Sequence, residues 1–220
     1  MKIIALLAST RGKKTATESM YNYLVDKFNK DNITIKMYRA HHIYKDANKR
    51  ELLLNELKDS DFLLICSPVY VHSLPYPLIV LMEYLAGETK PSFWLDKKMM
   101  AIIHSGYPKD IQRKASLAIC KNFAVELGIK WQGGIGFGGT PIIDGRPLEE
   151  SGGFTKWMRK ALDEMGHSII AGEELSSKSY DFAQKHFPSI PLWILKIMMN
   201  LRSKSQAKKN GVDLYAIPYL

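Results

Sequence analysis

Residues 62–75 read FLLICSPVYVHSLP, and this stretch decides the fold. Residues 62–66 form a continuous apolar run, which is typical of a central strand in a parallel sheet because both faces of such a strand are buried. A loop of small, aromatic and polar residues follows directly. Residues 77–86 then have apolar side chains at positions i, i+3, i+4 and i+7, which predicts a helix. The stretch is therefore one strand–loop–helix unit of an α/β protein.

Similar units continue from this stretch in both directions along the chain. We expect strands at residues 2–8, 33–38, 62–66, 99–104 and 131–137. We expect helices at residues 17–28, 48–58, 77–86, 111–127 and 154–165, the last two ending at Gly128 and Gly166. Strict alternation predicts crossover connections and a parallel sheet with helices on both faces. Ligands of such sheets bind beyond the carboxyl ends of the strands, so we look for a site there.

The composition narrows the possible partners. The chain has 220 residues, of which 46% are hydrophobic, and its 31 Lys and Arg against 22 Asp and Glu give a net charge of +9. This balance favours anionic small molecules, nucleic acid or an anionic membrane surface. The basic residues lack interleaved aromatics or a nucleic-acid motif, so we expect no nucleic-acid partner.

The cysteines and the apolar segments indicate where the protein works. Cys66 and Cys120 are the only cysteines, which argues against a disulfide framework, an iron–sulfur cluster or a cysteine-based zinc site. The apolar N-terminal run ends at Arg11 and is too short for a signal peptide, and no window approaches the ~20 apolar residues of a spanning helix. We therefore expect a soluble, cytoplasmic protein.

The composition changes near the C-terminus. We expect one domain over residues 1–185 and a C-terminal extension over residues 186–220, which carries five Lys or Arg and one Asp, a net +4. Residues 187–201 predict a helix that is apolar nearly all round, and the polar residues 202–210 follow it. Burial against the domain and a homodimer partner is favoured over contact with an anionic membrane, because the basic and apolar faces do not separate cleanly.

The loop after the first strand has the chemistry of an anion site. Ser9, Thr15 and Thr17 carry hydroxyls and Arg11 a guanidinium, between a strand and a helix N-terminus. Free N–H groups and the helix dipole favour an anion at that position, so the loop predicts phosphate binding. The alternative is a solvated loop with a capping box formed by Thr15 and Glu18.

Two further loops follow the third and fourth strands. The first, residues 67–75, offers Tyr70 as one wall of a slot for a flat ring, or else it only packs beneath the next helix. In the second, Gly106 allows close approach of the backbone to a ligand and Tyr107 offers a second wall, although the same residues suit an ordinary turn.

Other motifs lack the context that their chemistry needs. Residues 134–139 match G-x-G-x-x-G, but they lie in a predicted strand and do not open a helix, so we expect a glycine-rich strand or bulge. The six histidines lack metal-ligand spacing, and we expect no metal site. Both cysteines are expected to be core residues and not nucleophiles.

Taken together, the loops resemble those of a known family. Ser-x-Arg followed by Thr-Ala-Thr is similar to the FMN-phosphate loop of flavodoxin-like proteins, and Ser67-Pro68-Val69-Tyr70 with Ser73-Leu74-Pro75 resembles the flavin loop of NAD(P)H-dependent FMN reductases. The resemblance covers about residues 1–170 and implies a flavodoxin-like five-stranded parallel sheet of order 2-1-3-4-5. It implies that the phosphate of FMN binds at Ser9, Arg11, Thr15, Ala16 and Thr17. It places the isoalloxazine against Pro68, Val69, Tyr70, Val71 and His72 on one side and Ser105, Gly106 and Tyr107 on the other.

The resemblance also implies a function. The protein would pass hydride from NAD(P)H through FMN to a small-molecule acceptor such as a quinone, a flavin or an azo compound. No catalytic side chain is expected, because the cofactor supplies the chemistry. His72 is interpreted as a rim residue, with proton placement near the ring as the alternative. Two other hypotheses are a non-enzymatic electron carrier with the same cofactor, and a protein of this shape that binds another phosphate ligand or none.

Overall fold

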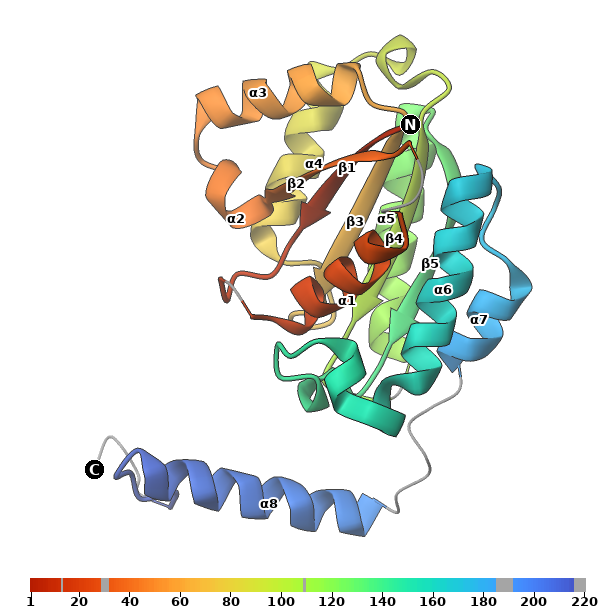
Figure 1. The fold of residues 1–220 in the computed structure, drawn as a ribbon. Helices are drawn as coiled ribbons and strands as arrows, with labels where there is room; N and C mark the ends of the chain where they lie inside the picture. Colours follow the sequence, from red (N-terminus) through yellow and green to blue (C-terminus); the bar gives the residue numbers. More distant parts are fainter. Residues whose placement is uncertain (13, 29–31, 109, 185–191, 216–220) are drawn as a thin grey trace. The chain divides into compact units, whose positions relative to one another are not determined.

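Five parallel strands form one sheet in the computed structural model, in the order β2-β1-β3-β4-β5 (Figure 1). The strands are β1 Lys2–Leu7, β2 Thr34–Arg39, β3 Phe62–Pro68, β4 Lys98–His104 and β5 Lys130–Phe137. All seven residues of β3 are buried, whereas β2 at the sheet edge contains only exposed and partly buried residues. The predicted strands and the flavodoxin-like strand order are thus confirmed, and the continuous apolar runs belong to strands covered on both faces.

The structure describes residues 1–12, 14–28, 32–108, 110–184 and 192–215. It divides into two compact units, Met1–His186 and Phe187–Leu220. The expected domain boundary at residue 185 lies outside the described residues.

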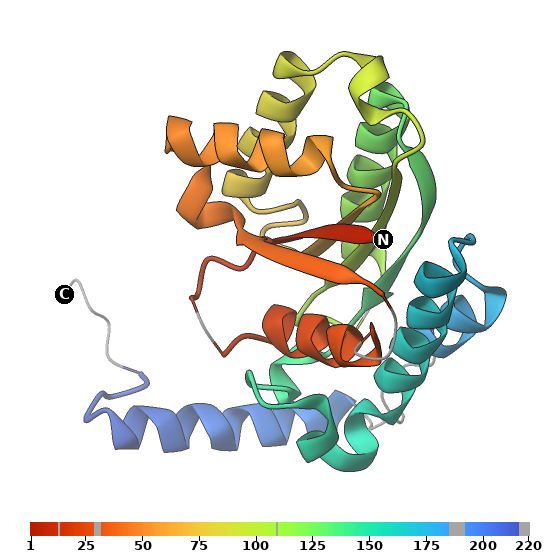
Figure 2. The ribbon, with the colours of Figure 1, turned by 45° about the horizontal axis from the view of Figure 1, so that its top comes forward.

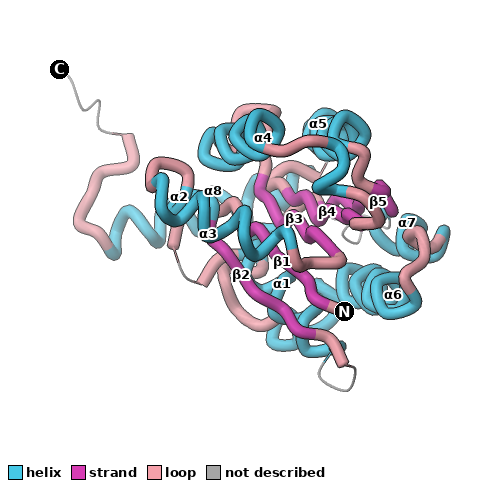
Figure 3. Tube along the Cα trace, turned by 90° about the horizontal axis from the view of Figure 1, so that it is seen from above, coloured by secondary structure: helices cyan, strands magenta, loops and turns pink. Residues whose placement is uncertain are grey.

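Helices cover both faces of the sheet in the first unit (Figure 3). Helices α1 (Ala16–Val25) and α6 (Lys156–Ala171) lie side by side on one face (Figure 2). Helices α3 (Ala47–Lys58), α4 (Tyr76–Glu88) and α5 (Ile111–Leu127) cover the other. Alternate residues of β1 supply the two cores, because successive side chains of a strand point to opposite faces.

Some helix bounds differ from the expectation for a physical reason. Helix α6 does not end at Gly166 but continues to Gly172, which has a φ of 68°. Gly166 lies within the helix, where a Cβ would make ordinary van der Waals contacts at 3.5 Å with Leu24 and 3.6 Å with Lys27, so this glycine does not end α6. Short helices α2 (Ala40–Ile43) and α7 (Ser177–Gln184) were not expected. They come with 3₁₀ segments η1 (Asp26–Phe28), η2 (Pro91–Trp94), η3 (Thr140–Ile142) and η4 (Leu148–Thr155).

The second unit contains helix α8 (Leu192–Lys209). The helix includes all four basic residues of the stretch 202–210 that was expected to follow it, so the predicted end at residue 201 is wrong. Trp193, Ile197 and Leu201 are exposed. Of the helices in the described part of the chain, none is both long enough and apolar enough to cross a membrane.

Candidate functional site

The three predicted loops leave the carboxyl ends of three neighbouring strands. They follow β1, β3 and β4, which are adjacent in the sheet, so the loops lie side by side. The N–H of Val69 donates to the carbonyl oxygen of His104 at 2.8 Å, which joins the second loop to the end of β4. The hydroxyl oxygens of Thr10 and Tyr70 lie 3.5 Å apart and bring the first loop to the second. The structure thus brings the predicted site residues to one edge of the sheet.

The first loop ends at the N-terminus of α1. Thr15 is the N-cap, and its hydroxyl accepts from the N–H of Glu18 at 3.2 Å. The capping box is incomplete, because the carboxylate of Glu18 accepts from the N–H of Lys14 at 2.7 Å and not from Thr15. Within the described residues, the N–H groups of Thr15, Ala16 and Thr17 have no acceptor. They form a donor set for an anion.

Charged and buried polar side chains shape this loop. Arg11 is exposed, whereas Ser9 is buried, and the Ser9 hydroxyl lies 3.4 Å from the N–H of Arg11. Arg39, at the end of β2, donates to the carbonyl oxygen of Gly12 at 3.2 Å and pairs with the carboxylate of Glu18 at 2.5 Å. The guanidinium of Arg39 therefore braces the loop, and that of Arg11 faces solvent, where it is accessible to a ligand.

The second loop contains a strained turn. Val71 and His72 have φ of 48° and 65°, and they connect Tyr70 to Ser73 as the two central residues of a tight hairpin. The N–H of Tyr70 donates to Ser73 at 2.9 Å, and the N–H of Ser73 donates back at 3.1 Å. A left-handed φ at a β-branched residue costs roughly 1–3 kcal/mol and is concentrated at ligand sites. The Val71 side chain is 94% exposed, so its burial does not stabilise this conformation.

The third loop presents N–H groups outward. The carbonyl oxygen of Ser105 accepts from the N–H of Thr140 at 3.3 Å and from its hydroxyl at 3.2 Å. Since the peptide is trans, the N–H of Gly106 points away from Thr140. Within the described ranges, the backbone N–H groups of Gly106 and Tyr107 donate to no acceptor. The Tyr107 side chain is 68% exposed.

A buried histidine connects the first and third loops. Nε2 of His104 lies 2.7 Å from the hydroxyl of Thr17, and Nδ1 lies 3.0 Å from that of Thr140. The Thr140 hydroxyl donates to Ser105, so Nδ1 of His104 carries the ring proton and Nε2 accepts from Thr17. Burial lowers the pKa of His104 to about 4, which keeps the imidazole neutral. The Thr17 hydroxyl is therefore committed to His104, and only its backbone N–H is available to a ligand.

Two residues of this network did not emerge as site residues from the sequence. His104 ends a predicted strand, and its position directly before the Ser-Gly turn was the available signal. Arg113 lies in α5 directly before Lys114, and two adjacent basic residues at the start of a helix give no sign of burial, yet the Arg113 side chain contacts the third loop. Both cysteines are buried and free, as expected of core residues, and burial raises the pKa of the Cys120 thiol to about 12.

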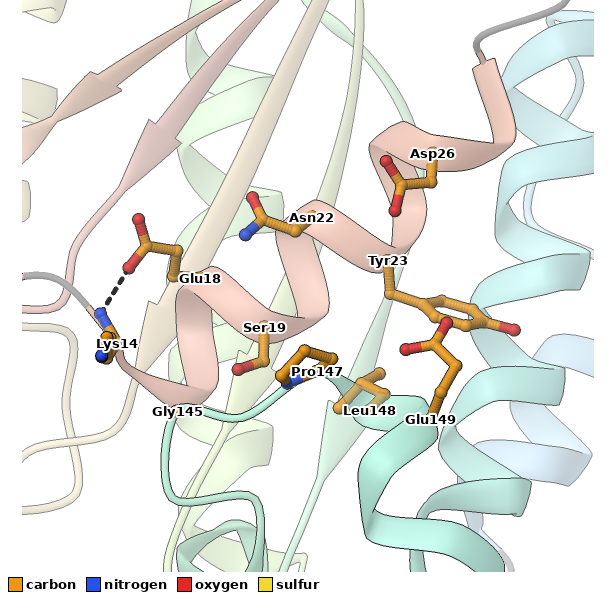
Figure 4. Close-up of a pocket in the computed structure, with 10 residues that line it drawn as sticks. All are labelled: Lys14, Glu18, Ser19, Asn22, Tyr23, Asp26, Gly145, Pro147, Leu148 and Glu149. Carbon is orange, nitrogen blue, oxygen red and sulfur yellow. Dashed lines mark hydrogen bonds between the residues drawn. The ribbon is translucent and has the colours of Figure 1, made fainter.

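A hollow of the surface borders the first loop and helix α1. It has a volume of about 560 Å³ and lies between α1 and the residues at the start of η4 (Figure 4). Its walls include Glu18 and Asn22 on the helix and Pro147 and Glu149 opposite them. No described residue of the second or third loop lines it, so this hollow is not the ring slot that was expected between those loops.

Comparisons with known proteins agree with the geometry. Residues 1–118, more than half of the chain, match the family model for NADPH-dependent FMN reductase. Among solved structures, an FMN-dependent NADH-azoreductase from Bacillus anthracis in complex with FMN is 13% identical, with a TM-score of 0.58, over 77% of this chain and 100% of that one. A putative quinone reductase from Klebsiella pneumoniae is 12% identical, with a TM-score of 0.60, over 79% of this chain and 86% of that one.

At these identities the solved structures establish the fold alone. No curated protein matches the sequence significantly. The family match rests on the part of the chain that contains β1, β3 and β4 with the three loops that follow them. The chain belongs to the NADPH-dependent FMN reductase family and is an FMN-dependent NAD(P)H oxidoreductase.

Proposed function

We propose that the chain holds FMN between its three loops and passes hydride from NAD(P)H to a small organic acceptor, such as a quinone, a free flavin or an azo compound. The observation that carries this proposal is the set of backbone N–H groups without acceptors, found in all three loops among the described residues. Such donors at one edge of a sheet suit a ligand that has acceptor atoms at both its phosphate and its ring.

The first loop suits the phosphate. The N–H groups of Thr15, Ala16 and Thr17 would hold its oxygens at the positive end of the α1 dipole. The guanidinium of Arg11 would add charge from the solvent side, and the Ser9 and Thr15 hydroxyls complete the predicted set. This arrangement favours a terminal phosphate dianion, which FMN has and FAD lacks.

The second and third loops suit the ring. Residues 68–72 and 105–107 would flank the isoalloxazine, with the exposed aromatic side chains of Tyr70 and Tyr107 available to contact it. The strained hairpin fixes the Val71 and His72 N–H groups, which have no acceptors in the described part of the chain. Preorganised donors of this kind cost no reorganisation when the ligand binds.

Bound FMN supplies hydride acceptance and donation at its ring. The protein's part is to orient the ring with N–H donors and to leave one face open to NAD(P)H and then to the acceptor. We assign no catalytic acid or base. His72 is exposed on the hairpin, which suits a rim residue in contact with incoming substrates.

We further propose a cytoplasmic homodimer. Two buried free thiols suit a reducing compartment. In helix α8 the side chains of Trp193 and Leu201 are 64% and 62% exposed, which is costly for apolar groups unless a partner covers them. A second copy of the chain is the proposed partner.

Titration with three flavins tests the cofactor site. We expect FMN to bind more tightly than riboflavin or FAD, and Arg11→Ala to weaken FMN by about 2 kcal/mol, the scale of a hydrogen bond to a charged group. Lys121→Ala, an exposed cation on α5, is the matched control and should leave FMN affinity unchanged. Equal FMN affinity in Arg11→Ala and the unmodified protein would refute the assignment of the phosphate to this loop.

A further inference from the structure

Arg113 is a buried cation close to the third loop. Its side chain is in the first turn of α5, and the residue is only 3% exposed. One guanidinium nitrogen, Nη1, donates to the Ser105 hydroxyl and to the carbonyl oxygen of Tyr107, both at 2.9 Å. The other, Nη2, donates to the carbonyl oxygen of Pro108 at 3.1 Å. One side chain thus contacts three residues of a four-residue loop.

One glycine in β5 and one directly after it make room for this side chain. A Cβ at Gly136 would lie 3.2 Å from Nε of Arg113, and a Cβ at Gly138 would lie 2.8 Å from Nη1 and 2.7 Å from the carbonyl oxygen of Pro108. This explains part of the glycine-rich run that is not a dinucleotide fingerprint. Its glycines accommodate an arginine and the loop that the arginine holds.

Burial of a guanidinium has a cost. Desolvation lowers the pKa of Arg113, so its surroundings disfavour the charged form. Three oriented acceptors in the loop offset that cost. The planar guanidinium of arginine can donate to all three at once, whereas the ammonium of lysine cannot. An apolar side chain would fill the same space without the desolvation cost of a buried charge. The presence of an arginine therefore points to a role for its hydrogen bonds.

The hydrogen bonds determine which groups the loop offers outward. Arg113 holds the carbonyl oxygens of Tyr107 and Pro108 inside, and Thr140 holds that of Ser105. Three of the four carbonyl oxygens of residues 105–108 are thereby used within the protein, whereas the N–H groups of Gly106 and Tyr107 remain without acceptors in the described residues.

We propose that Arg113 is a positioning residue for the flavin ring, which it serves by fixing residues 105–108 so that their N–H groups face the ring's acceptor atoms. This rests on the proposed function, since it assumes that the ring lies against the third loop. Hydrogen bonds strengthen when the acceptor carries charge, so the same donors favour the reduced ring over the oxidised one.

Riboflavin and FMN separate ring binding from phosphate binding. The experiment measures the Kd of each for the unmodified protein, Arg113→Lys and Gly138→Ala, together with the midpoint potential of the bound flavin. Lys114→Gln, the exposed neighbour on α5, is the control for Arg113→Lys, and Gly87→Ala, where a Cβ meets nothing within 4 Å, is the control for Gly138→Ala. Circular dichroism checks that each variant is folded.

We expect Arg113→Lys to raise both Kd values by the same factor, about tenfold, because the lost contacts serve the ring and not the phosphate. Gly138→Ala should act in the same direction, and both variants should make the potential more negative. If Arg113→Lys does not fold, the Gly138→Ala result decides. Unchanged riboflavin affinity and potential in folded variants would refute the role of Arg113 alone. If the unmodified protein binds neither flavin, the proposed function fails as well.

Discussion

Replacement of His104 by glutamine tests whether the buried imidazole is neutral. His104 is faced by the hydroxyls of Thr17 and Thr140, and burial lowers its pKa to about 4 in the folded protein. An unfolded histidine has a pKa of about 6.5. Between these values the unfolded chain binds more protons than the native one, so stability must fall as pH decreases. The stabilisation is present above pH 6.5 and is lost on approach to pH 4.

The two pKa values give the size of the effect. At pH 7 the proton linkage of one such group is close to zero, whereas at pH 5 it favours the unfolded state by about 2 kcal/mol. The unmodified protein should therefore lose about 2 kcal/mol more free energy of unfolding between pH 7 and pH 5 than His104→Gln. Other titrating groups are common to both proteins, so they cancel in the difference.

Urea denaturation at several pH values between 4.5 and 7.5 measures this difference. His104→Gln should be less stable at pH 7, because it loses one hydrogen bond of the network, but its stability should depend less on pH. A control with His167→Gln, an exposed histidine on α6, should keep the pH dependence of the unmodified protein. Parallel pH profiles for His104→Gln and the unmodified protein would show that the imidazole is not held neutral.

Three other predictions concern the loops and the C-terminal helix. Tyr70→Ala should lower the affinity for FMN and shift the absorption spectrum of the bound flavin. An unchanged spectrum and affinity would show that Tyr70 does not contact the ring. Gly145→Ala should cost about 1–3 kcal/mol of stability and weaken FMN, because φ is 72° and its Cβ would overlap the Lys14 carbonyl; differential scanning calorimetry and FMN titration check both. Deletion of residues 186–220 should give an insoluble or monomeric protein with altered activity. A truncated protein that stays dimeric and active, while only the full chain sediments with anionic liposomes, would contradict the dimer.

The sequence predicts the sheet well because its strands carry their own signal. Strand β3 is an apolar run because both of its faces are buried, and α4 has apolar residues at helical spacing because only one of its faces is buried. The alternation of strands and helices along the chain then requires crossover connections. The end of α6 was mispredicted because Gly166 signals a helix end locally. The structure shows that Leu24 and Lys27 pack near Gly166, which lies in the interior of the helix.

The sequence predicts that the three loops of the candidate site lie together, but it does not predict the contacts within them. Loops after neighbouring strands must meet, so residues such as Ser9 and Tyr70 follow from topology. The left-handed φ of Val71 runs against the preference of a β-branched residue, and no propensity would predict it. The burial of Arg113 depends on glycines some 25 residues further along the chain, a spacing that carries no local signal.

Anaerobic stopped-flow spectroscopy tests the central claim most directly. FMN-loaded protein is mixed with NADH or NADPH, and the flavin absorption is followed with no other protein present. We expect the flavin band to bleach on mixing and to return when a quinone is added, because the proposed binding mode leaves one face of the ring open to both substrates. If the protein binds FMN but the band persists with either nicotinamide, the chain does not take hydride from NAD(P)H, and the electron-carrier hypothesis replaces the reductase.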